Sequence, residues 1–491
     1  MKKKLLLIVP HQDDELFAGG GILTKASTDP SIEAYVLFIT NGDFYPGEVE
    51  HRLQESLETL VNCFHLAERN IIFLGYGDTW KGNKHIYNAP NQCGLESVAG
   101  HTMTYALQNH PEYRYLKSGK HSVYCRAELK NDLKDAIIDI RADILICVDY
   151  DPHPDHRAVS LLFEECMGEI LRENMEYRPA VLKTFAYDGM WKGEADFFVL
   201  PHRKTQIAQM HNPTLRIEDG IRIPVPRECN TVYLKDNILY QASKRYKTQS
   251  AWQKADRFIN ADMIFWKRNT CNLLYQADLT ASTGTVRYVA DFKTFDCKDV
   301  LDGEVLADDC AWIPVHEDRH KSIIIHFDMP VAVSVINIYA LNNKSGILNS
   351  RFVFDNGYVL STGELNATGK VNHFVFETQD GIKEIRYQLD EYYGVAPGIT
   401  EIEVLEKAED IDDILCLFPE VYSTTICARD RFFIQIEKGI FQIKKFLSIC
   451  FPNGYFMRKY YPALNEKRYY RGFYHVSYLV SHLVQRFKAL K

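Results

Sequence analysis

Residues 5–15 read Leu-Leu-Leu-Ile-Val-Pro-His-Gln-Asp-Asp-Glu, a short apolar run that stops abruptly at polar, mostly ionisable side chains. The apolar part is too short to span a membrane, and its continuity predicts a central strand of a parallel sheet, buried on both faces. Ligands of open α/β sheets collect beyond the carboxyl ends of the strands. Imidazole and carboxylate groups at that place, from His11, Asp13 and Asp14, indicate a divalent-metal site.

A second constellation of histidine and aspartate follows another predicted strand, at residues 143–148. There the chain continues as Asp-Tyr-Asp-Pro-His-Pro-Asp-His-Arg-Ala-Val over residues 149–159. Both constellations therefore come directly after an apolar run that reads as a buried strand.

The two constellations resemble the signatures of the PIG-L/LmbE-like family of metal-dependent N-acetylglucosaminyl deacetylases. The first matches His-Pro-Asp-Asp-Glu except that Gln12 replaces the proline, and the second matches His-Pro-Asp-His-x-Ala-Val at every position from His153. Residues 244–250 are similar to a late helix of the family, so the resemblance covers about residues 1–275. It implies an α/β deacetylase domain over residues 1–280, with a Rossmann-like, mostly parallel sheet.

The resemblance also implies a role for six side chains. Three of them are metal ligands, namely His11, Asp14 and His156. The expected metal is Zn²⁺, with another divalent ion such as Fe²⁺ as the alternative. Asp13 corresponds to the general base, His153 to the group that stabilises the oxyanion, and Asp155 to a residue that orients a histidine.

Three further positions belong to family-like stretches, two of them in turns at the same predicted edge of the sheet and one in a predicted helix. Asn41 lies in Thr-Asn-Gly-Asp after the second predicted strand, and Asp78 in Gly-Tyr-Gly-Asp after the third. Arg52 precedes Glu55 by one helical turn, in a family-like Arg-x-x-Glu. We expect Asn41, Arg52 and Asp78 to contact the substrate. A helix cap at Asp78 and an exposed ion pair between Arg52 and Glu55 remain open as alternatives.

From residue 286 to residue 407 the sequence changes to short alternating apolar runs separated by turn residues, such as Ser-Ile-Ile-Ile-His-Phe at 322–327. This spacing is typical of a β-sandwich, and the segment resembles a discoidin or galactose-binding-like domain. Two interpretations stay open: a carbohydrate-binding accessory domain, and a structural domain that packs on the catalytic one.

A basic helical tail is predicted over residues 408–491. From residue 428 to the end there are 13 Lys/Arg and 3 Asp/Glu, a charge of +10, which leaves −18 for the rest of a chain of net charge −8. Apolar residues follow helical spacing at 433–450 and 476–490, with basic and aromatic residues interleaved between them. This pattern suits an anionic membrane surface, and it also suits a partner in a glycan-assembly complex or a packed helical domain.

The overall composition restricts the class of protein. The 491 residues, 46% of them hydrophobic, can bury several cores, and a sequence pI near 6.1 argues against nucleic-acid binding by the whole molecule. The twelve cysteines form no Cys-x-x-Cys pair, and no signal peptide or long apolar run is present. We therefore expect reduced thiols in a cytoplasmic protein, peripheral at the membrane if the tail binds lipid.

Together these inferences predict a metal-dependent hydrolase that removes the N-acetyl group from an N-acetylglucosamine-type sugar. The sugar would belong to a glycan, nucleotide-sugar or glycolipid precursor. The alternative is a carbohydrate-binding or scaffold protein of a glycan-assembly complex, with an inactive metal site.

Overall fold

The computed structural model describes residues 2–78, 86–89, 91–193, 204–231, 233–295, 311–341, 343–407 and 428–450. The chain divides into two units, of which one holds both sheets described below and the other holds helix α9 (Ala428–Cys450). The helical spacing predicted for 433–450 falls inside α9. The helix predicted over 476–490 and the basic, aromatic stretch before it lie outside the described residues. No helix of the described part of the chain combines the length and hydropathy that crossing a bilayer requires.

The first sheet has seven strands in the order β3-β2-β1-β4-β5-β7-β6. They are β1 (Lys3–Val9), β2 (Ile32–Thr40), β3 (Ile71–Tyr76), β4 (Ile144–Val148), β5 (Ala180–Thr184), β6 (Ile221–Pro224) and β7 (Asp262–Arg268). Strand β1 pairs in parallel with β2 on one side and β4 on the other, whereas β7 and β6 add an antiparallel edge. The predicted α/β fold, with a mostly parallel sheet around residues 5–9, is confirmed.

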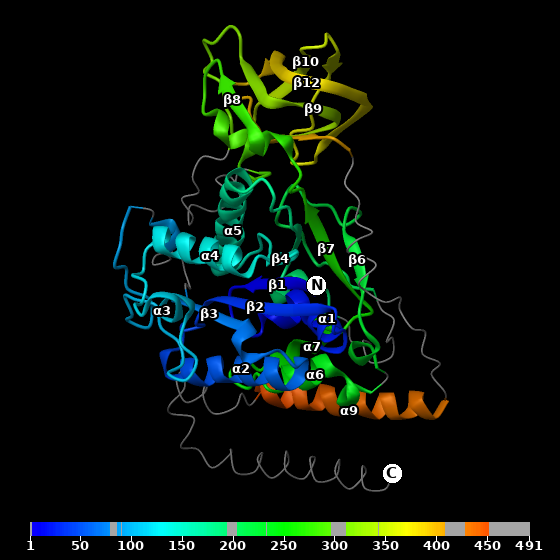
Figure 1. The fold of residues 1–491 in the computed structure, drawn as a ribbon. Helices are drawn as coiled ribbons and strands as arrows, with labels where there is room; N and C mark the ends of the chain where they lie inside the picture. The colour runs from blue at the N-terminus through cyan, green and yellow to red at the C-terminus, as the bar shows by residue number, and fades with distance from the viewer. Residues whose placement is uncertain are drawn as a thin grey trace. The chain divides into compact units, whose positions relative to one another are not determined.

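Helices cover both faces of this sheet (Figure 1). On one side lie α1 (Asp14–Thr28), α2 (Val49–Phe64), α6 (Ile238–Ser243) and α7 (Ala255–Phe258), and on the other α4 (Arg126–Ile140) and α5 (Pro154–Glu173). The side chains of β4 and the last five of β1 are all buried. Gly19 lets α1 pack closely on β1, because a Cβ atom there would lie 2.5 Å from Leu7 Cδ2.

The strand order places the ends of β1 and β4 side by side. After β1 the chain crosses to β2, and after β4 it crosses in the opposite direction to β5. The place where successive connections leave in opposite directions is a topological switch point, and the loops that diverge there leave a crevice at the carboxyl edge of the sheet. Residues 10–15 and 149–156 follow these two strand ends, so both predicted constellations meet in that crevice.

The second sheet is antiparallel, in the order β11-β10-β12-β9-β13, with β8 also paired to β9. Its strands are β8 (Ala277–Ala281), β9 (Ser322–Ala340), β10 (Gly346–Phe354), β11 (Val359–Ser361), β12 (Asn372–Tyr393) and β13 (Ile399–Leu405). The predicted sandwich-like fold is confirmed, but the sheet already includes residues 277–281, before the boundary expected at 286. The sequence predicts two separate strands within each of the long strands β9 and β12. In the structure the pairing between β9 and β12 shifts in register but does not end, so each forms one continuous strand.

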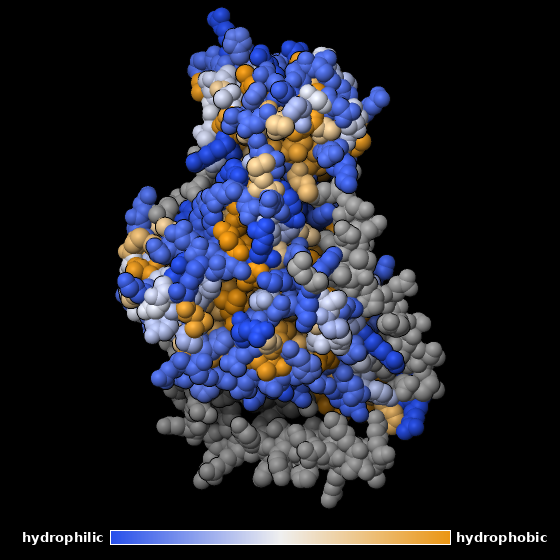
Figure 2. All heavy atoms as spheres, in the orientation of Figure 1, coloured by the Kyte–Doolittle hydropathy of each residue, from blue (hydrophilic) through white to orange (hydrophobic). Residues whose placement is uncertain are grey.

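Buried hydrogen bonds anchor β13 to the segment that leads from β7 to β8. The Asn272 amide donates from Nδ2 to the carbonyl of Ile402 (2.7 Å) and accepts at Oδ1 from the N–H of Val404 (2.9 Å). The Tyr275 hydroxyl donates to Glu401 Oε1 at 3.2 Å. All seven residues of β13 are buried, so no water replaces these bonds. On the face drawn in Figure 2, by contrast, hydrophilic side chains cover much of the visible described surface.

We expect Asn272→Ala to lower the free energy of unfolding by about 2–3 kcal/mol, because it leaves a buried carbonyl and a buried N–H without partners. Denaturant unfolding measures this change. The control is Asn356→Ala, which removes an exposed amide bonded to Gln379 and should change stability by no more than about 0.5 kcal/mol. Equal stability of the two variants would contradict the anchoring role.

Candidate active site and metal centre

Two loops form the site at the carboxyl ends of β1 and β4. The structure brings together all six residues predicted as ligands or catalytic groups, which are His11, Asp13, Asp14, His153, Asp155 and His156. Five of them are buried, and His153 is partly exposed. Charge removed from water in this way is stable only when it is paired or bound to a metal.

The Asp14 carboxylate lies between two imidazole rings. Its Oδ2 atom is 3.0 Å from His11 Nδ1 and 3.1 Å from His156 Nε2. Burial alone would raise the pKa of Asp14, but the two histidines hold that pKa well below its usual range. Two imidazole nitrogens and one carboxylate oxygen are ligand types suited to Zn²⁺.

A carboxylate holds the remaining nitrogen of each histidine. His11 Nε2 lies 3.1 Å from Asp155 Oδ2, and His156 Nδ1 lies 2.7 Å from Asp151 Oδ2. A carboxylate that accepts the N–H of one ring nitrogen leaves the other nitrogen unprotonated and aimed at a metal. The residues therefore fit a divalent ion. Asp151 was not predicted, although its place in the second constellation was a signal.

Two other ligand combinations share His11. In one, ligand atoms of His11, His153 and His156 lie within 4.8 Å of one another, and in the other those of His11, Asp78 and Asp155 do. The second would use the His11 nitrogen that Asp155 already holds. We favour His11, Asp14 and His156, because among the carboxylates of these combinations Asp14 is the one at hydrogen-bond distance from both the His11 and the His156 ring.

Asp13 combines a strained backbone with a perturbed carboxyl group. Its φ of 101° is in the left-handed region, where a residue other than glycine is held only by its surroundings. Burial raises the pKa of Asp13, the charge of Asp14 adds to this, and Lys254 and Arg52 oppose it. Strain together with a raised pKa is typical of a base that works near neutral pH.

Arg52 supports the turns of the site. Its Nη1 donates to the carbonyl of Gly42 (3.1 Å), its Nη2 donates to the carbonyl of Gln12 (3.2 Å), and Nη2 lies 3.7 Å from Asp13 Oδ1. The alternative of an exposed ion pair with Glu55 is wrong. Arg52 is buried against these turns, and Glu55 accepts hydrogen bonds from Thr248 instead.

Asn41 and Asp78 differ in how their polar atoms are used. Asn41 is fully buried, and its Nδ2 donates to the carbonyl of Tyr105 at 2.7 Å, so its donor group supports the fold. Asp78 Oδ1 lies 3.6 Å from His11 Nε2 and accepts no hydrogen bond from the described residues. Asn41 Oδ1 likewise accepts no hydrogen bond from the described residues, so each residue has an unused acceptor, and that of Asp78 lies beside ligand His11.

His153 is arranged as a neutral donor. It caps the first turn of α5, where its Nδ1 accepts the backbone N–H of Asp155 at 3.3 Å. The neutral ring must then carry its proton on Nε2. Burial and the nearby rings of His156 and His11 lower the pKa of His153 to about 2, which keeps the ring neutral.

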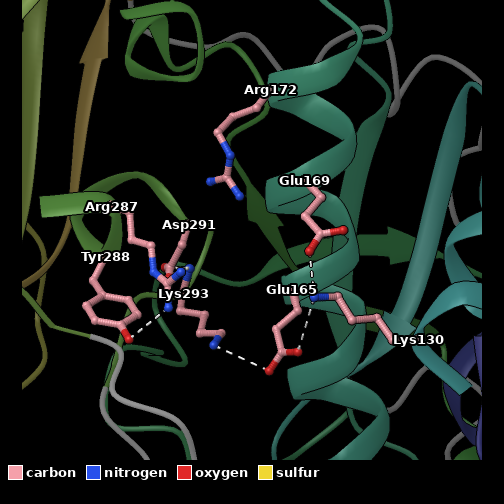
Figure 3. A pocket seen from close by; sticks show the side chains of 8 residues that line it. All are labelled: Lys130, Glu165, Glu169, Arg172, Arg287, Tyr288, Asp291 and Lys293. Carbon is pink, nitrogen blue, oxygen red and sulfur yellow. Dashed lines mark hydrogen bonds and ion pairs between the residues drawn. The ribbon is translucent and has the colours of Figure 1, made fainter. Parts of the chain in front are cut away.

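A charged cleft of about 160 Å³ includes none of these residues in its lining (Figure 3). It is lined by Lys130, Glu165, Glu169, Arg172, Arg287, Tyr288, Asp291 and Lys293. Lys130 pairs with Glu169 at 2.5 Å, and Lys293 pairs with Glu165 at 3.4 Å. Both lysines in the lining are thus paired with glutamates of the same cleft.

Comparison with known proteins agrees with the two constellations. The family described as PIG-L, GlcNAc-PI de-N-acetylase, matches residues 6–167, a range that contains both of them. Residues 6–167 form a PIG-L family domain. The predicted resemblance to this family is thereby confirmed for residues 6–167. No curated protein matches the sequence.

Solved structures similar to the chain include one deacetylase and several sugar-binding modules. N,N'-diacetylchitobiose deacetylase from Pyrococcus horikoshii is 15% identical, covers 55% of this chain and 84% of its own, and has a TM-score of 0.32. The family 32 carbohydrate-binding module of Clostridium perfringens NanJ, in complex with galactose, is 16% identical over 27% of this chain and 94% of its own, with a TM-score of 0.20. Chitosan-binding module 1 from a Paenibacillus chitosanase/glucanase is 13% identical over 27% and 97%, also with a TM-score of 0.20.

We expect Asp151→Asn to weaken Zn²⁺ binding by about 10- to 100-fold, because the His156 ring loses the carboxylate that orients it. Competition with a chromophoric chelator measures the affinity. The matched control is Asp132→Asn, another fully buried carboxylate, which pairs with Arg114 and should leave the affinity unchanged. An unaltered affinity in Asp151→Asn would remove the assigned role.

Proposed function

We propose that this protein is a zinc-dependent N-deacetylase that acts on an N-acetylglucosamine-type sugar. One observation carries the proposal: Asp14 Oδ2 lies between His11 Nδ1 and His156 Nε2, next to the buried carboxyl group of Asp13. The PIG-L family domain over residues 6–167 supports both the reaction and the type of sugar.

His11, Asp14 and His156 would hold the metal ion, Zn²⁺ or alternatively Fe²⁺. When bound, such an ion polarises the amide carbonyl and makes its bound water more acidic. Asp155 and Asp151 keep the two histidine rings in their metal-binding orientation.

The remaining side chains supply proton transfer and charge stabilisation. Asp13 takes a proton from the attacking water and delivers it to the nitrogen of the amide as the C–N bond breaks, which yields acetate and the free amino sugar. The raised pKa of Asp13 strengthens it as a base. His153 donates a hydrogen bond from Nε2 to the carbonyl oxygen, on which negative charge develops.

Substrate contact is assigned to the unused acceptor of Asp78. A buried carboxylate oxygen that accepts no hydrogen bond is costly, and a sugar hydroxyl would supply the missing donor to Asp78 Oδ1, which accepts none from the described residues. Arg52 and Asn41 shape the turns around the sugar through their contacts with Gly42 and Tyr105.

A carbohydrate-binding or scaffold protein with an inactive metal site is the second candidate. The observation in its favour is the second sheet. This sheet contributes none of the residues described above for the active site, so catalysis does not account for it. Under this alternative the chain would bind metal and acetylated sugar but release no acetate.

For the basic tail we propose peripheral binding to an anionic membrane surface from the cytoplasmic side, with a glycan-assembly partner as the alternative. The charge of +10 from residue 428 onward supports attraction to anionic lipid. The carrier of the sugar would then be a lipid.

Vesicle flotation tests the membrane proposal. We expect the full chain to float with vesicles that contain phosphatidylserine, less so as salt is raised, because screening weakens the attraction. The matched variant replaces five tail cations with glutamate, namely Arg458, Lys459, Lys467, Arg468 and Arg471. Equal flotation of both proteins, or none of either, would count against a lipid surface and in favour of a protein partner.

The catalytic proposal predicts different losses for a base and for a ligand. Asp13→Ala should keep the metal and lose roughly 10²- to 10⁴-fold in turnover, since proton transfer is removed. His11→Ala should lose the metal itself. Acetate release from soluble, nucleotide-linked and lipid-linked N-acetylglucosamine compounds, with metal content measured in parallel, separates the two effects.

Acetate release from these three kinds of compound also decides between the two candidate functions. Release from a lipid-linked compound alone would support a lipid carrier, and release from soluble sugars would argue against one. Full activity of Asp13→Ala would refute its role as the base. Metal-loaded protein that binds these sugars without releasing acetate would support the binding or scaffold function.

A further inference from the structure

The strained turn at Asp13 has a support from within its own signature. Glu15 lies in the first turn of α1, is fully buried, and accepts the backbone N–H of Asp13 on Oε2 at 3.0 Å. A non-glycine residue keeps a φ of 101° only where surrounding contacts fix it. The Glu15 carboxyl group is such a contact, because it binds the peptide unit that carries the strain.

Tyr246 holds the other oxygen of Glu15. Its hydroxyl donates to Glu15 Oε1 across a separation of 231 residues in the sequence. Both side chains are fully buried. Burial and the neighbouring Glu15 carboxyl group raise the pKa of Tyr246 well above its usual range, so the hydroxyl keeps its proton and can donate it.

The segment that carries Tyr246 is itself anchored to α2. The N–H and Oγ1 of Thr248 donate to Glu55 Oε2 at 3.1 and 2.7 Å. Arg52, one turn earlier in the same helix, donates to the Gln12 carbonyl at 3.2 Å. Helix α2 therefore fixes the residue before Asp13 through Arg52, and through Glu55 it fixes the segment that supports Asp13 from the other side.

We propose that Glu15 and Tyr246 are positioning residues that hold Asp13 in its strained conformation, with Tyr246 acting through Glu15. The inference rests on the proposed role of Asp13 as the base. It gives a purpose to the last residue of the first signature. It does the same for residues 244–250, which resemble a late family helix but form turns here after α6 ends at Ser243.

Tyr246→Phe tests this directly, because it removes one hydroxyl and keeps the ring. We expect kcat to fall by about 10- to 100-fold with KM unchanged, since a displaced base impairs the chemical step and not sugar binding. The control is Tyr177→Phe, another buried tyrosine, whose hydroxyl donates to the Ala142 carbonyl at 2.8 Å at the opposite end of the strands. The kcat of Tyr177→Phe should equal that of the unmodified protein, although its melting temperature should fall by about as much as that of Tyr246→Phe.

A second readout does not depend on turnover. Ligand Asp14 follows Asp13 directly, so release of the turn should change the visible absorption spectrum of the Co²⁺-loaded protein in Tyr246→Phe but not in Tyr177→Phe. Glu15→Gln, which keeps the side-chain volume, provides an independent variant if Tyr246→Phe fails to fold. The double variant should lose no more kcat than the more impaired single variant, because both act through one contact.

Several outcomes would overturn the inference. These are a kcat of Tyr246→Phe equal to that of Tyr177→Phe, losses that add in the double variant, or a cobalt spectrum that neither substitution at Glu15 and Tyr246 alters. Absence of acetate release by the unmodified, metal-loaded protein would instead refute the proposed function. The cobalt spectra would still decide whether the two residues hold the turn.

Discussion

Burial of charge at the ends of β1 and β4 is the constraint on which the rest of the structure depends. Carboxylates and imidazoles that lose water must each find an opposite charge, a hydrogen bond or a metal ion. Asp14 serves two rings at once, while Asp155 and Asp151 take up the outer nitrogens of His11 and His156. Because the partners come from two loops, the site can form only if β1 and β4 are neighbours in the sheet.

The supports around Asp13 follow from the same constraint. A strained peptide unit next to buried charge needs rigid contacts, and water cannot supply them in a closed interior. Arg52 reaches the turn from α2, and Tyr246 reaches it through Glu15. Each support is a buried polar group that makes hydrogen bonds of its own, so the turn is held by a hydrogen-bonded network and not by packing alone.

Much of the first domain could be predicted from the sequence because its signals are local. An apolar run that ends in ligand residues identifies both a buried strand and its functional end, and α/β topology brings two such ends together. The contact between Glu15 and Tyr246 could not be predicted, because it joins positions 231 residues apart and depends on the path of the chain after α6. Asp151 lay within a recognised constellation, but its role follows only from the orientation of the His156 ring.

The second sheet shows a different limit of sequence reasoning. Residues 328–332, which include Pro330, and residues 377–384, which include Gly381, read as turns between short strands, yet β9 and β12 continue through both segments with register shifts. Alternation of side chains identifies the buried face of a strand but does not say whether an interruption of that alternation is a turn or a bulge. The outcome there is decided by pairing with the neighbouring strand, a non-local interaction.

Several groups beside the metal ligands have no part in binding an ion, and their arrangement favours an active enzyme over a metal-binding scaffold. A site that only held an ion would need His11, Asp14 and His156 together with the carboxylates that orient the rings. It would not need a strained Asp13, a neutral N–H donor at His153, or an acceptor at Asp78 that no described residue satisfies with a hydrogen bond. Strain and an unpaired buried oxygen each lower stability. Their coincidence beside one set of ligands is explained if a substrate and a transition state provide the missing interactions.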